Sequence, residues 1–446
     1  MAADYKIEEE SVERPSFLSV LIRTINIVFL IILAIVMLFF LVLIKSKTTV
    51  PFSKNQMLFF YAIFVTTFVL SRVIASMFYN RTLRKLTKGS YEGGKFEPRV
   101  SFIIPCKNEE KAIAKTISRC FDVDYPKDKM EVIVINDGST DNTLFVLKNI
   151  KKKFGNLTVI GWERNRGKRH AMAAGIRRAS GDIIIQMDSD SFIKPNTFRK
   201  LIEPFQNLEI GAVCAHATPE NANENILTRM QAAYYFMSFR ILKAAESAFA
   251  TVFCCSGCSS AYRKSVVLPI LDKWLNERFL GKPVTWGDDR ALTSWVLKSG
   301  YKTVYTDKAR AYTIVPNNLS QLLKQQIRWK KSWIINSFFT SKFIYKKQPF
   351  VAFFYYFPLL LVSFLTPFMA LRALIYDPIF SQVAPIYYFL GVLFVTTLIV
   401  IYYRLLAPRD RYWPYLFLWS MFNILFLSYL IFYAALNLQN RKWGTR

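Results

Sequence analysis

Two carboxylates separated by one residue, Asp188 and Asp190, are the first feature of this sequence that could do chemistry. They follow the apolar run 182–187, so we expect them where a buried strand ends. Paired carboxylate oxygens can hold Mg²⁺ or Mn²⁺, and such an ion neutralises a diphosphate leaving group. Lys168 and Arg169 lie upstream and could meet the phosphate charge. Alone, the pair is a weak signal, because two acids in a surface turn are common.

A second acidic pair, Asp288 and Asp289, opens a stretch with a helical pattern. Acids at a helix start can serve only to compensate the helix dipole. A carboxylate within reach of an acceptor hydroxyl can instead act as a general base. We assign this role to Asp289.

The elements that must position these acids are short apolar runs separated by helical stretches. Residues 101–105, 132–136 and 182–187 are such runs, and each ends in polar residues. The pattern predicts an α/β domain with a mostly parallel sheet. Ligands of such sheets bind at the carboxyl ends of the strands, where Asn108 and Asp137 also fall. No P-loop or Rossmann glycine motif occurs in this part of the sequence.

Long apolar runs flank this domain on both sides. The first contains eighteen consecutive apolar residues, enough to cross a hydrocarbon core. Two prolines, Pro358 and Pro367, interrupt the third run, so we expect part of it to lie at the interface or to re-enter the membrane. The five runs are 27–44, 57–79, 349–371, 378–403 and 412–440.

The basic residues around these runs set the expected orientation. More Lys and Arg flank the central domain than lie between the first two runs, which places that domain in the cytosol of a multi-pass plasma-membrane protein. Membrane lipids are therefore expected partners. The expected divisions are a cytosolic segment 1–24, two transmembrane helices 25–79, the catalytic domain 80–320, interface helices 321–348, transmembrane or interfacial helices 349–440 and a cytosolic tail 441–446.

The composition of the chain excludes further classes of protein. The chain of 446 residues has 59 Lys and Arg against 31 Asp and Glu, a formal charge of +28, yet 52% of it is hydrophobic. That hydrophobic share excludes a disordered chain, and the apolar blocks weigh against a nucleic-acid partner. Two histidines and one Cys254-Cys255-x-x-Cys258 cluster make a zinc site a poor interpretation.

Together, the motifs resemble the processive membrane glycosyltransferases of family 2, which include cellulose, chitin and hyaluronan synthases. The resemblance covers residues from about 100 to 335, and several motifs in the right order are far more specific than any one of them. These motifs are Pro105 with Asn108-Glu109, Asn136-Asp137-Gly138-Ser139, Gly167-Lys168-Arg169, Asp188-Ser189-Asp190, Gly287-Asp288-Asp289 and Gln325-x-x-Arg328-Trp329.

Within that group, the chain is most similar to hyaluronan synthases. The segments 165–171, 279–284, 287–293 and 325–332 and the terminal Trp443-Gly444-Thr445-Arg446 carry this likeness. In that family the last motif belongs to a cytosolic loop near the nucleotide, which implies an inside C-terminus and one apolar run that does not span. Two departures face the acceptor in the family: Cys258-Ser259 replaces Pro-Leu, and Ile335-Asn336 replaces Arg-Glu.

The resemblance implies a GT-A-like fold, a Mg²⁺ or Mn²⁺ cofactor, and roles for matching residues. Asp289 would be the catalytic base, and Asp190, with Asp188, would hold the metal. Cys255, Ser256 and Gly257 would line the acceptor site, where Trp329 would also hold the acceptor sugar. The expected nucleotide and substrate contacts are Pro105, Asn108, Glu109, Asp137, Lys168, Arg169, Asp188, Asp288, Arg290, Gln325, Arg328, Trp329, Trp443 and Arg446.

The implied activity is polymerisation of hyaluronan from UDP-N-acetylglucosamine and UDP-glucuronate by a monomer that also moves the growing polysaccharide across the membrane. Several alternatives stay open. One is a chitin, chito-oligosaccharide or poly-N-acetylglucosamine synthase that uses UDP-N-acetylglucosamine only, and another makes a different uronate-containing capsule polymer. A non-processive transferase acting on a lipid carrier would not need the Gln-x-x-Arg-Trp segment. An inactive scaffold or export channel would have no reason to keep all these acids.

Overall fold

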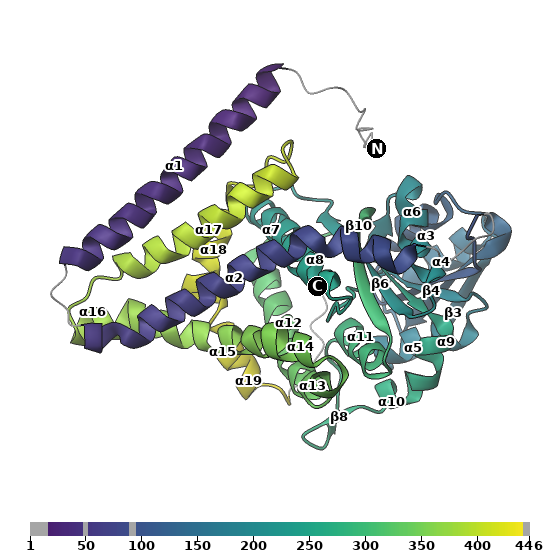
Figure 1. Ribbon diagram of the computed structural model, residues 1–446. Helices are drawn as coiled ribbons and strands as arrows, with labels where there is room; N and C mark the ends of the chain where they lie inside the picture. Colours follow the sequence, from purple (N-terminus) through teal and green to yellow (C-terminus); the bar gives the residue numbers. More distant parts are fainter. Residues whose placement is uncertain (1–16, 48–51, 89–94, 440–446) are drawn as a thin grey trace.

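The computed structural model describes residues 17–47, 52–88 and 95–439, which form an α/β part and a bundle of long apolar helices (Figure 1). The α/β part lies between the second and third of the apolar runs in sequence, as the composition predicts. In Figure 1 the long helices extend from one end of the sheet, on the side where both termini of the α/β part join the bundle.

One eight-stranded sheet organises the α/β part, in the order β3-β2-β1-β4-β7-β6-β10-β5. The first four strands are parallel, β7 runs antiparallel to both of its neighbours, β6 and β10 are parallel, and β5 is antiparallel to β10. The predicted mostly parallel sheet is therefore confirmed. The strands are β1 (Val100–Cys106), β2 (Met130–Asp137), β3 (Leu157–Trp162), β4 (Ile183–Gln186), β5 (Ser191–Ile193), β6 (Ile210–Pro219), β7 (Ser260–Arg263) and β10 (Lys302–Thr313).

Both faces of the sheet are covered, which explains why its strands read as continuous apolar runs. Along β1, Phe102 and Ile104 face one core, and Ile103 faces the other. The first core is closed by α3 (Ile113–Phe121), α4 (Thr143–Lys151) and α6 (Phe198–Ile202). The second is closed by α5 (Lys168–Arg178), α7 (Ile226–Met237), η4 (Ser238–Lys243), α8 (Ala244–Ala248), α9 (Lys264–Val267), α10 (Leu271–Leu275) and α11 (Asp288–Lys298).

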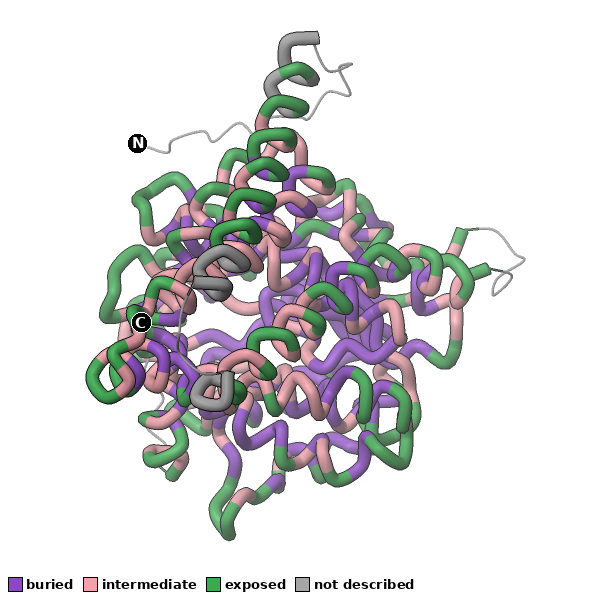
Figure 2. The backbone as a smooth tube through the Cα atoms, turned by 60° about the vertical axis from the view of Figure 1, so that its left-hand side comes forward, coloured by how far each residue is buried: buried purple, intermediate pink, exposed green. Residues whose placement is uncertain are grey.

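The long helices come from both ends of the described chain. Three are long and apolar enough to cross a membrane: 56–87 in α2 (Phe52–Thr87), the composite helix 349–380, and α17 (Ile386–Leu406). A shorter apolar stretch, 24–40, lies in α1 (Phe17–Lys47). Large apolar side chains are exposed along these helices, as a surface that faces lipid requires. Figure 2 shows the exposed residues along their length. The helix that carries Gln325, Arg328 and Trp329 is α12 (Leu319–Ser341), followed by α13 (Ile344–Lys347).

Proline does not interrupt the third apolar run, so the expectation of a break there is wrong. Residues 349–380 form one helix made of α14 (Pro349–Val351), η6 (Ala352–Tyr356), α15 (Phe357–Leu371), η7 (Arg372–Tyr376) and α16 (Asp377–Phe380). The segment η6 is a π-helical turn directly before Pro358, and Pro367 lies inside α15. A wider turn accommodates the proline ring and the missing N–H without ending the helix.

The fifth apolar run is bent. It consists of α18 (Tyr415–Phe422), the π-helical turn η8 (Asn423–Leu427) and α19 (Leu430–Leu436), with a bend of 42° between its two halves. Both ends contact the α/β part: Arg229 Nη1 donates to Tyr415 Oη at 3.1 Å, and Lys282 Nζ donates to Gln439 Oε1 at 2.6 Å. The segment therefore leaves the α/β part and returns to it.

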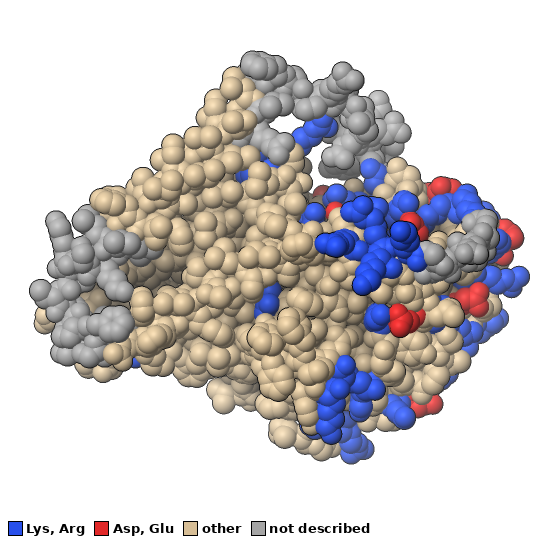
Figure 3. All heavy atoms as spheres, viewed as in Figure 1, with Lys and Arg blue, Asp and Glu red and all other residues tan. Residues whose placement is uncertain are grey.

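Basic residues border the apolar helices where they meet the α/β part (Figure 3). Arg81, Arg84 and Lys85 lie exposed at the end of α2, and Lys342, Lys346 and Lys347 lie exposed around α13. Such positions suit contact with anionic lipid headgroups.

Candidate active site

A single large cavity joins the two parts of the molecule. Its volume is about 1470 Å³, and its walls include the carboxyl ends of the parallel strands, α12 and the apolar helices α2, α15 and α19. Pro105, Asp137, Asp188 and Asp289 line one end, and Thr366 lies among the apolar helices at the other. The cavity therefore continues from the edge of the sheet into the helix bundle.

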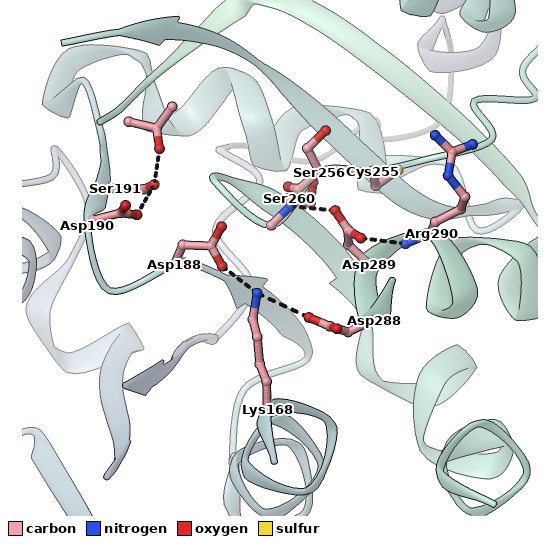
Figure 4. Close-up of polar contacts among 12 residues, drawn as sticks. Lys168, Asp188, Asp190, Ser191, Cys255, Ser256, Ser260, Asp288, Asp289 and Arg290 are labelled. Atoms are coloured by element: carbon pink, nitrogen blue, oxygen red, sulfur yellow. Dashed lines mark hydrogen bonds and ion pairs between the residues drawn. The ribbon is translucent and has the colours of Figure 1, made fainter. Parts of the chain in front are cut away.

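A lysine bridges the two acidic pairs at the sheet end (Figure 4). Lys168 Nζ lies 2.8 Å from Asp188 Oδ1 and 3.1 Å from Asp288 Oδ2. Burial lowers the pKa of Lys168, but the two carboxylates outweigh it and the pKa is raised overall. For Asp288, burial is opposed by Lys168 and Arg169, and its pKa is lowered. The structure thus brings together the two predicted pairs, which are about 100 residues apart in sequence.

Asp190 belongs to the same end of the cavity. Its Oδ1 lies 3.1 Å from Ser191 Oγ, which in turn lies 2.9 Å from Thr313 Oγ1 on β10 (Figure 4). These contacts fix the carboxylate between the end of β4 and the end of β10. Asp190 and Asp188 both line the cavity.

Asp289 is held in place by two backbone donors. The N–H of Gly257 donates to its Oδ2 at 3.1 Å, and the N–H of Arg290 donates to its Oδ1 at 2.8 Å. Gly287, the N-cap of α11, has φ +70°, and a Cβ there would lie 1.8 Å from Ser332 Oγ on α12. The tight approach of α11 and α12 therefore requires glycine at this position.

The loops after β1 and β2 hold one another. Asn108, in the left-handed region with φ +55°, accepts the N–H of Thr140 through Oδ1 at 2.8 Å. Asp137 accepts the N–H groups of Arg166 at 2.6 Å and Gly167 at 2.9 Å. Asp137 thus positions the loop that leads into α5. Pro105, Asn108 and Glu109 also line the cavity.

Arg169 lines the cavity, and its guanidinium also has partners within the α/β part. Its side chain is buried, forms an ion pair with Glu277 at 3.0 Å, and donates to the carbonyls of Trp274 and Trp286 at 3.0 and 3.1 Å. These partners occupy both terminal nitrogens of the guanidinium. Arg169 therefore holds the segment that precedes Asp288, whereas Lys168 faces the carboxylates.

The predicted acceptor residues divide between the cavity wall and the layer behind it. Ser256 and Gly257 line the cavity, together with Cys254 and Cys258. Cys255 is fully buried, is not part of the cavity lining, and its N–H donates to Thr293 Oγ1 at 3.0 Å. At Gly257, a Cβ would lie 2.9 Å from Asp188 Oδ1, so the backbone itself forms the wall there.

Three of the site residues predicted from the sequence lie on α12. Gln325, Arg328 and Trp329 line the cavity, and Trp329 also packs against the second core. Ile335 and Asn336 do not line it: Ile335 packs on Val284 and Trp286, behind the acidic pair of α11. Trp443 and Arg446 lie outside the described residues.

Sequence reasoning missed several charged residues that line the cavity. Arg72, Lys243 and Glu246 lie at its membrane end, and Lys330 lines it from α12. In the sequence, Arg72 stands near the end of an apolar run, where a long side chain can reach toward the membrane interface. No sequence pattern relates it to Glu246. Burial lowers the pKa of Lys330 to about 8.

Comparison with protein families matches residues 101–269 to the model described as "Glycosyl transferase family 2". A hyaluronan synthase of Streptococcus pyogenes is 30% identical over 364 residues, which cover 80% of this chain and 85% of that protein. An N-acetylglucosaminyltransferase of Mesorhizobium japonicum is 34% identical over 252 residues, which cover 55% of this chain and 58% of that protein.

Among solved structures, a mannosyltransferase from Pyrobaculum calidifontis, in complex with GDP-Man and Mn²⁺, matches with a TM-score of 0.57 and 18% identity. The match covers 86% of this chain and 100% of that chain. The likeness shows a shared fold, and the predicted GT-A-like architecture agrees with it.

Proposed function

Because this chain belongs to glycosyl transferase family 2 and is related to hyaluronan synthases, we propose that it polymerises hyaluronan from UDP-N-acetylglucosamine and UDP-glucuronate and passes the product across the plasma membrane. The chain is a glycosyltransferase with helices long and apolar enough to span a membrane. The catalytic domain would lie in the cytosol, and the bent segment α18–α19 would return the C-terminus to the same side.

The continuous cavity is the observation that carries this proposal. It begins at the acidic pairs and extends between apolar helices to Thr366 and Asn423. A transferase that released each product to the cytosol would need no opening toward the bundle. Since donor site and exit path lie in one chain, we infer that a monomer suffices.

A divalent metal ion fits the acidic end. Asp288 Oδ1 is buried without a hydrogen-bond partner among the described residues, and Lys168 already places one positive charge between Asp188 and Asp288. No group of three or more His, Cys, Asp or Glu side chains in the described ranges could hold a metal, which suits an ion that keeps water and phosphate ligands. Asp190 and Asp188 would hold Mg²⁺ or Mn²⁺, which when bound neutralises charge on the diphosphate.

The protein's own residues would bind and orient the reactants. Lys168 starts α5, whose N-terminal N–H groups follow Gly167 and suit phosphate oxygens. Asp289 would accept the proton of the acceptor hydroxyl, because each of its carboxylate oxygens has a further lone pair besides the one that meets the N–H of Gly257 or Arg290. The acceptor oxygen then bonds to the anomeric carbon, the bond to the diphosphate oxygen breaks, UDP leaves, and the anomeric centre inverts. Arg328 and Trp329 would hold the diphosphate and the acceptor sugar.

Polymer synthesis by the purified chain tests the proposal. UDP release and product are measured with Mg²⁺ or Mn²⁺ and with UDP-N-acetylglucosamine alone, UDP-glucuronate alone, or both. Sustained turnover only with both donors, giving a hyaluronidase-sensitive polymer, is the expected result. Sustained turnover on UDP-N-acetylglucosamine alone would instead support the second candidate, a chitin-like synthase, which the 34% identity to an N-acetylglucosaminyltransferase favours.

A further inference from the structure

A short hairpin outside the main sheet carries a large apolar residue at its tip. Its strands are β8 (Arg278–Phe279) and β9 (Lys282–Pro283), and Leu280 and Gly281 join them. Both loop residues have positive φ, +49° and +78°, and glycine, asparagine or aspartate is the usual first residue of such a turn. Leucine is strained in this conformation, yet 70% of Leu280 is exposed. Neither packing within the chain nor the backbone conformation therefore explains why leucine occupies this position.

The hairpin packs on the ends of two helices at the border of the apolar bundle. The ring of Phe279 lies 5.7 Å from that of Phe338, in the last turn of α12, and Lys282 bonds to Gln439, shortly after α19. The short helix α13 follows α12 and directly precedes the composite helix 349–380. In Figure 1 the hairpin, labelled β8, lies beside α13. The hairpin is therefore level with the point where the composite helix would enter a bilayer.

The surface around the tip is apolar and basic. The side chains of Phe338, Tyr345 and Leu436 are also exposed there. Residues 336–350 contain no acid, and the one acid of residues 276–286, Glu277, is buried in its ion pair with Arg169. Exposed apolar side chains flanked by cations are typical of segments that lie in the headgroup region of a bilayer. The exposed basic residues are Arg278, Lys282, Lys342, Lys346 and Lys347.

A bilayer suits this surface better than a sugar chain does. Sugars are bound through hydrogen bonds and aromatic faces, and the side chain of Leu280 offers neither. Exposed apolar residues continue along α19 to Leu436, so the lipid that covers this helix reaches the height of the hairpin. The tip therefore has an apolar environment available without any further protein.

The base of the hairpin is tied to the active site. The N–H of Val284 donates to the carbonyl of Glu277 at 2.9 Å, and the carboxylate of Glu277 pairs with Arg169. Residues 283–285 line the cavity shortly before Asp288. Fixing the tip would therefore restrict the segment that leads to the acidic pair of α11.

We propose that the hairpin anchors the α/β part to the bilayer, with Leu280 at the boundary between headgroups and acyl chains and with Arg278 and Lys282 at the lipid phosphates. Burial of the leucine side chain in lipid would offset the strain of its backbone conformation. The anchor goes beyond the proposed polymerase function, because it does not depend on which sugar is transferred.

Spin labelling of the full chain in nanodiscs tests the anchor. A nitroxide is attached to Leu280→Cys, and its collisions with molecular oxygen, which concentrates among acyl chains, are compared with those of a water-soluble nickel chelate. We expect the label to lie about 5–10 Å inside the headgroup boundary, the depth of interfacial segments. Unsubstituted protein treated in the same way gives the background, because Cys254 is only partly buried. Since Leu280 is exposed, its substitution leaves the core intact.

Two controls accompany this measurement. Leu268→Cys labels another exposed leucine, in η5 (Leu268–Ile270) after α9, which lies in Figure 1 at the end of the α/β part away from the apolar helices. That label should meet the nickel chelate freely. In the Leu280→Cys chain, replacing both Arg278 and Lys282 by Gln should make the label shallower in nanodiscs that contain phosphatidylglycerol. Lys273→Gln, an exposed lysine on α10, should not change the depth.

Each outcome decides for or against the anchor. A label at position 280 that meets the nickel chelate as freely as the Leu268→Cys label would overturn it. A label shielded from both reagents would also overturn it, because protein, such as a second copy of the chain, would then cover the tip. Frequent collisions with oxygen and rare ones with nickel support the anchor, and they would do so even if the donor experiment removed the proposed function.

Discussion

The two ends of the cavity are built from opposite charges and from different secondary structure. At the sheet end, Asp188 and Asp288 each form an ion pair with Lys168, and Asp190 and Asp289 also line the cavity. At the membrane end, Lys243, Arg290 and Arg72 lie within electrostatic reach of Glu246, on helices that include π-helical turns. The charges of the first end are mostly acidic, and those of the second are mostly basic.

The proposed function would use both ends of the cavity. A diphosphate with its metal ion needs a rigid set of oxygens, and the ends of parallel strands supply one. A polymer that stays bound while it moves at each step would need attraction without close complementarity. The following predictions test whether the two ends are as distinct as their residues suggest.

The largest effect is expected for Asp289→Asn. The variant keeps the size of the side chain and one of its two backbone hydrogen bonds, because the amide nitrogen cannot accept the other N–H. It removes the proton acceptor, so polymer synthesis should fall about 100- to 10,000-fold. Donor binding, measured by titration with UDP, should stay within twofold of the wild type. The matched control is Asp272→Asn, an exposed acid that forms an ion pair with Arg177 away from the cavity. Substantial activity in Asp289→Asn would show that another group is the base.

Removing a buried ion pair that stabilises the sheet end of the cavity should give the next largest effect. Arg169→Met leaves the buried Glu277 carboxylate without its partner, and the loss of one partner of a buried pair costs about 3–5 kcal/mol of stability. Thermal unfolding in detergent measures it. Arg177→Met removes an exposed arginine of the adjacent ion pair and should change the Tm little. Similar Tm values for the two variants would contradict a framework role for Arg169.

Gly287→Ala tests the contact that sets the position of the acidic pair on α11. The added methyl group would clash with Ser332, and a residue with a Cβ is strained at a φ of +70°. Together these effects should lower the folding stability by about 1–3 kcal/mol. We expect a lower kcat with UDP binding retained, because Asp289 moves while Lys168 does not. Gly300→Ala is the matched control, since its φ is +92° but nothing lies within 4 Å of the added methyl. If both variants keep full activity, the approach of α11 to α12 does not position the base.

Much of the sheet end could be predicted from the sequence. Apolar runs of strand length ended where β1, β2 and β4 end, so the acids that followed them had to meet at one edge. The directions in which neighbouring side chains point could not be predicted. Lys168 faces the acids and Arg169 the core, because α5 packs one side on the sheet.

The membrane end was less predictable, because its contacts join distant segments. Arg72 and Glu246 come within electrostatic reach of each other only because α2 packs on α8, and no local sequence pattern indicates this packing. The helix through Pro358 depends on a π-helical turn that composition does not reveal. The bend of the fifth run and its two contacts with the α/β part are likewise not visible in its composition.

The smallest expected effect is the loss of folding stability caused by burying the charged side chain of Lys330. Burial alone lowers its pKa to about 8, and no charged group contributes to the shift. Between pH 8 and the ordinary lysine range near 10.5, the unfolded chain binds this proton and the folded chain does not, so the stability of the wild type rises with pH in that window. Below pH 8 the folded protein carries the buried charge at its full cost.

Lys330→Met should therefore unfold at a higher temperature than the wild type at pH 7, and the difference should shrink as the pH approaches 10. Thermal unfolding of both proteins across this range measures it, with Lys342→Met as the exposed control that shows no such trend. A difference that is independent of pH would mean that the pKa of Lys330 is the same in the folded and unfolded chains, so that its charge is not penalised by burial. In that case Lys330 would be a solvated cation, and the contrast between the two ends of the cavity would rest on Arg72, Lys243 and Arg290.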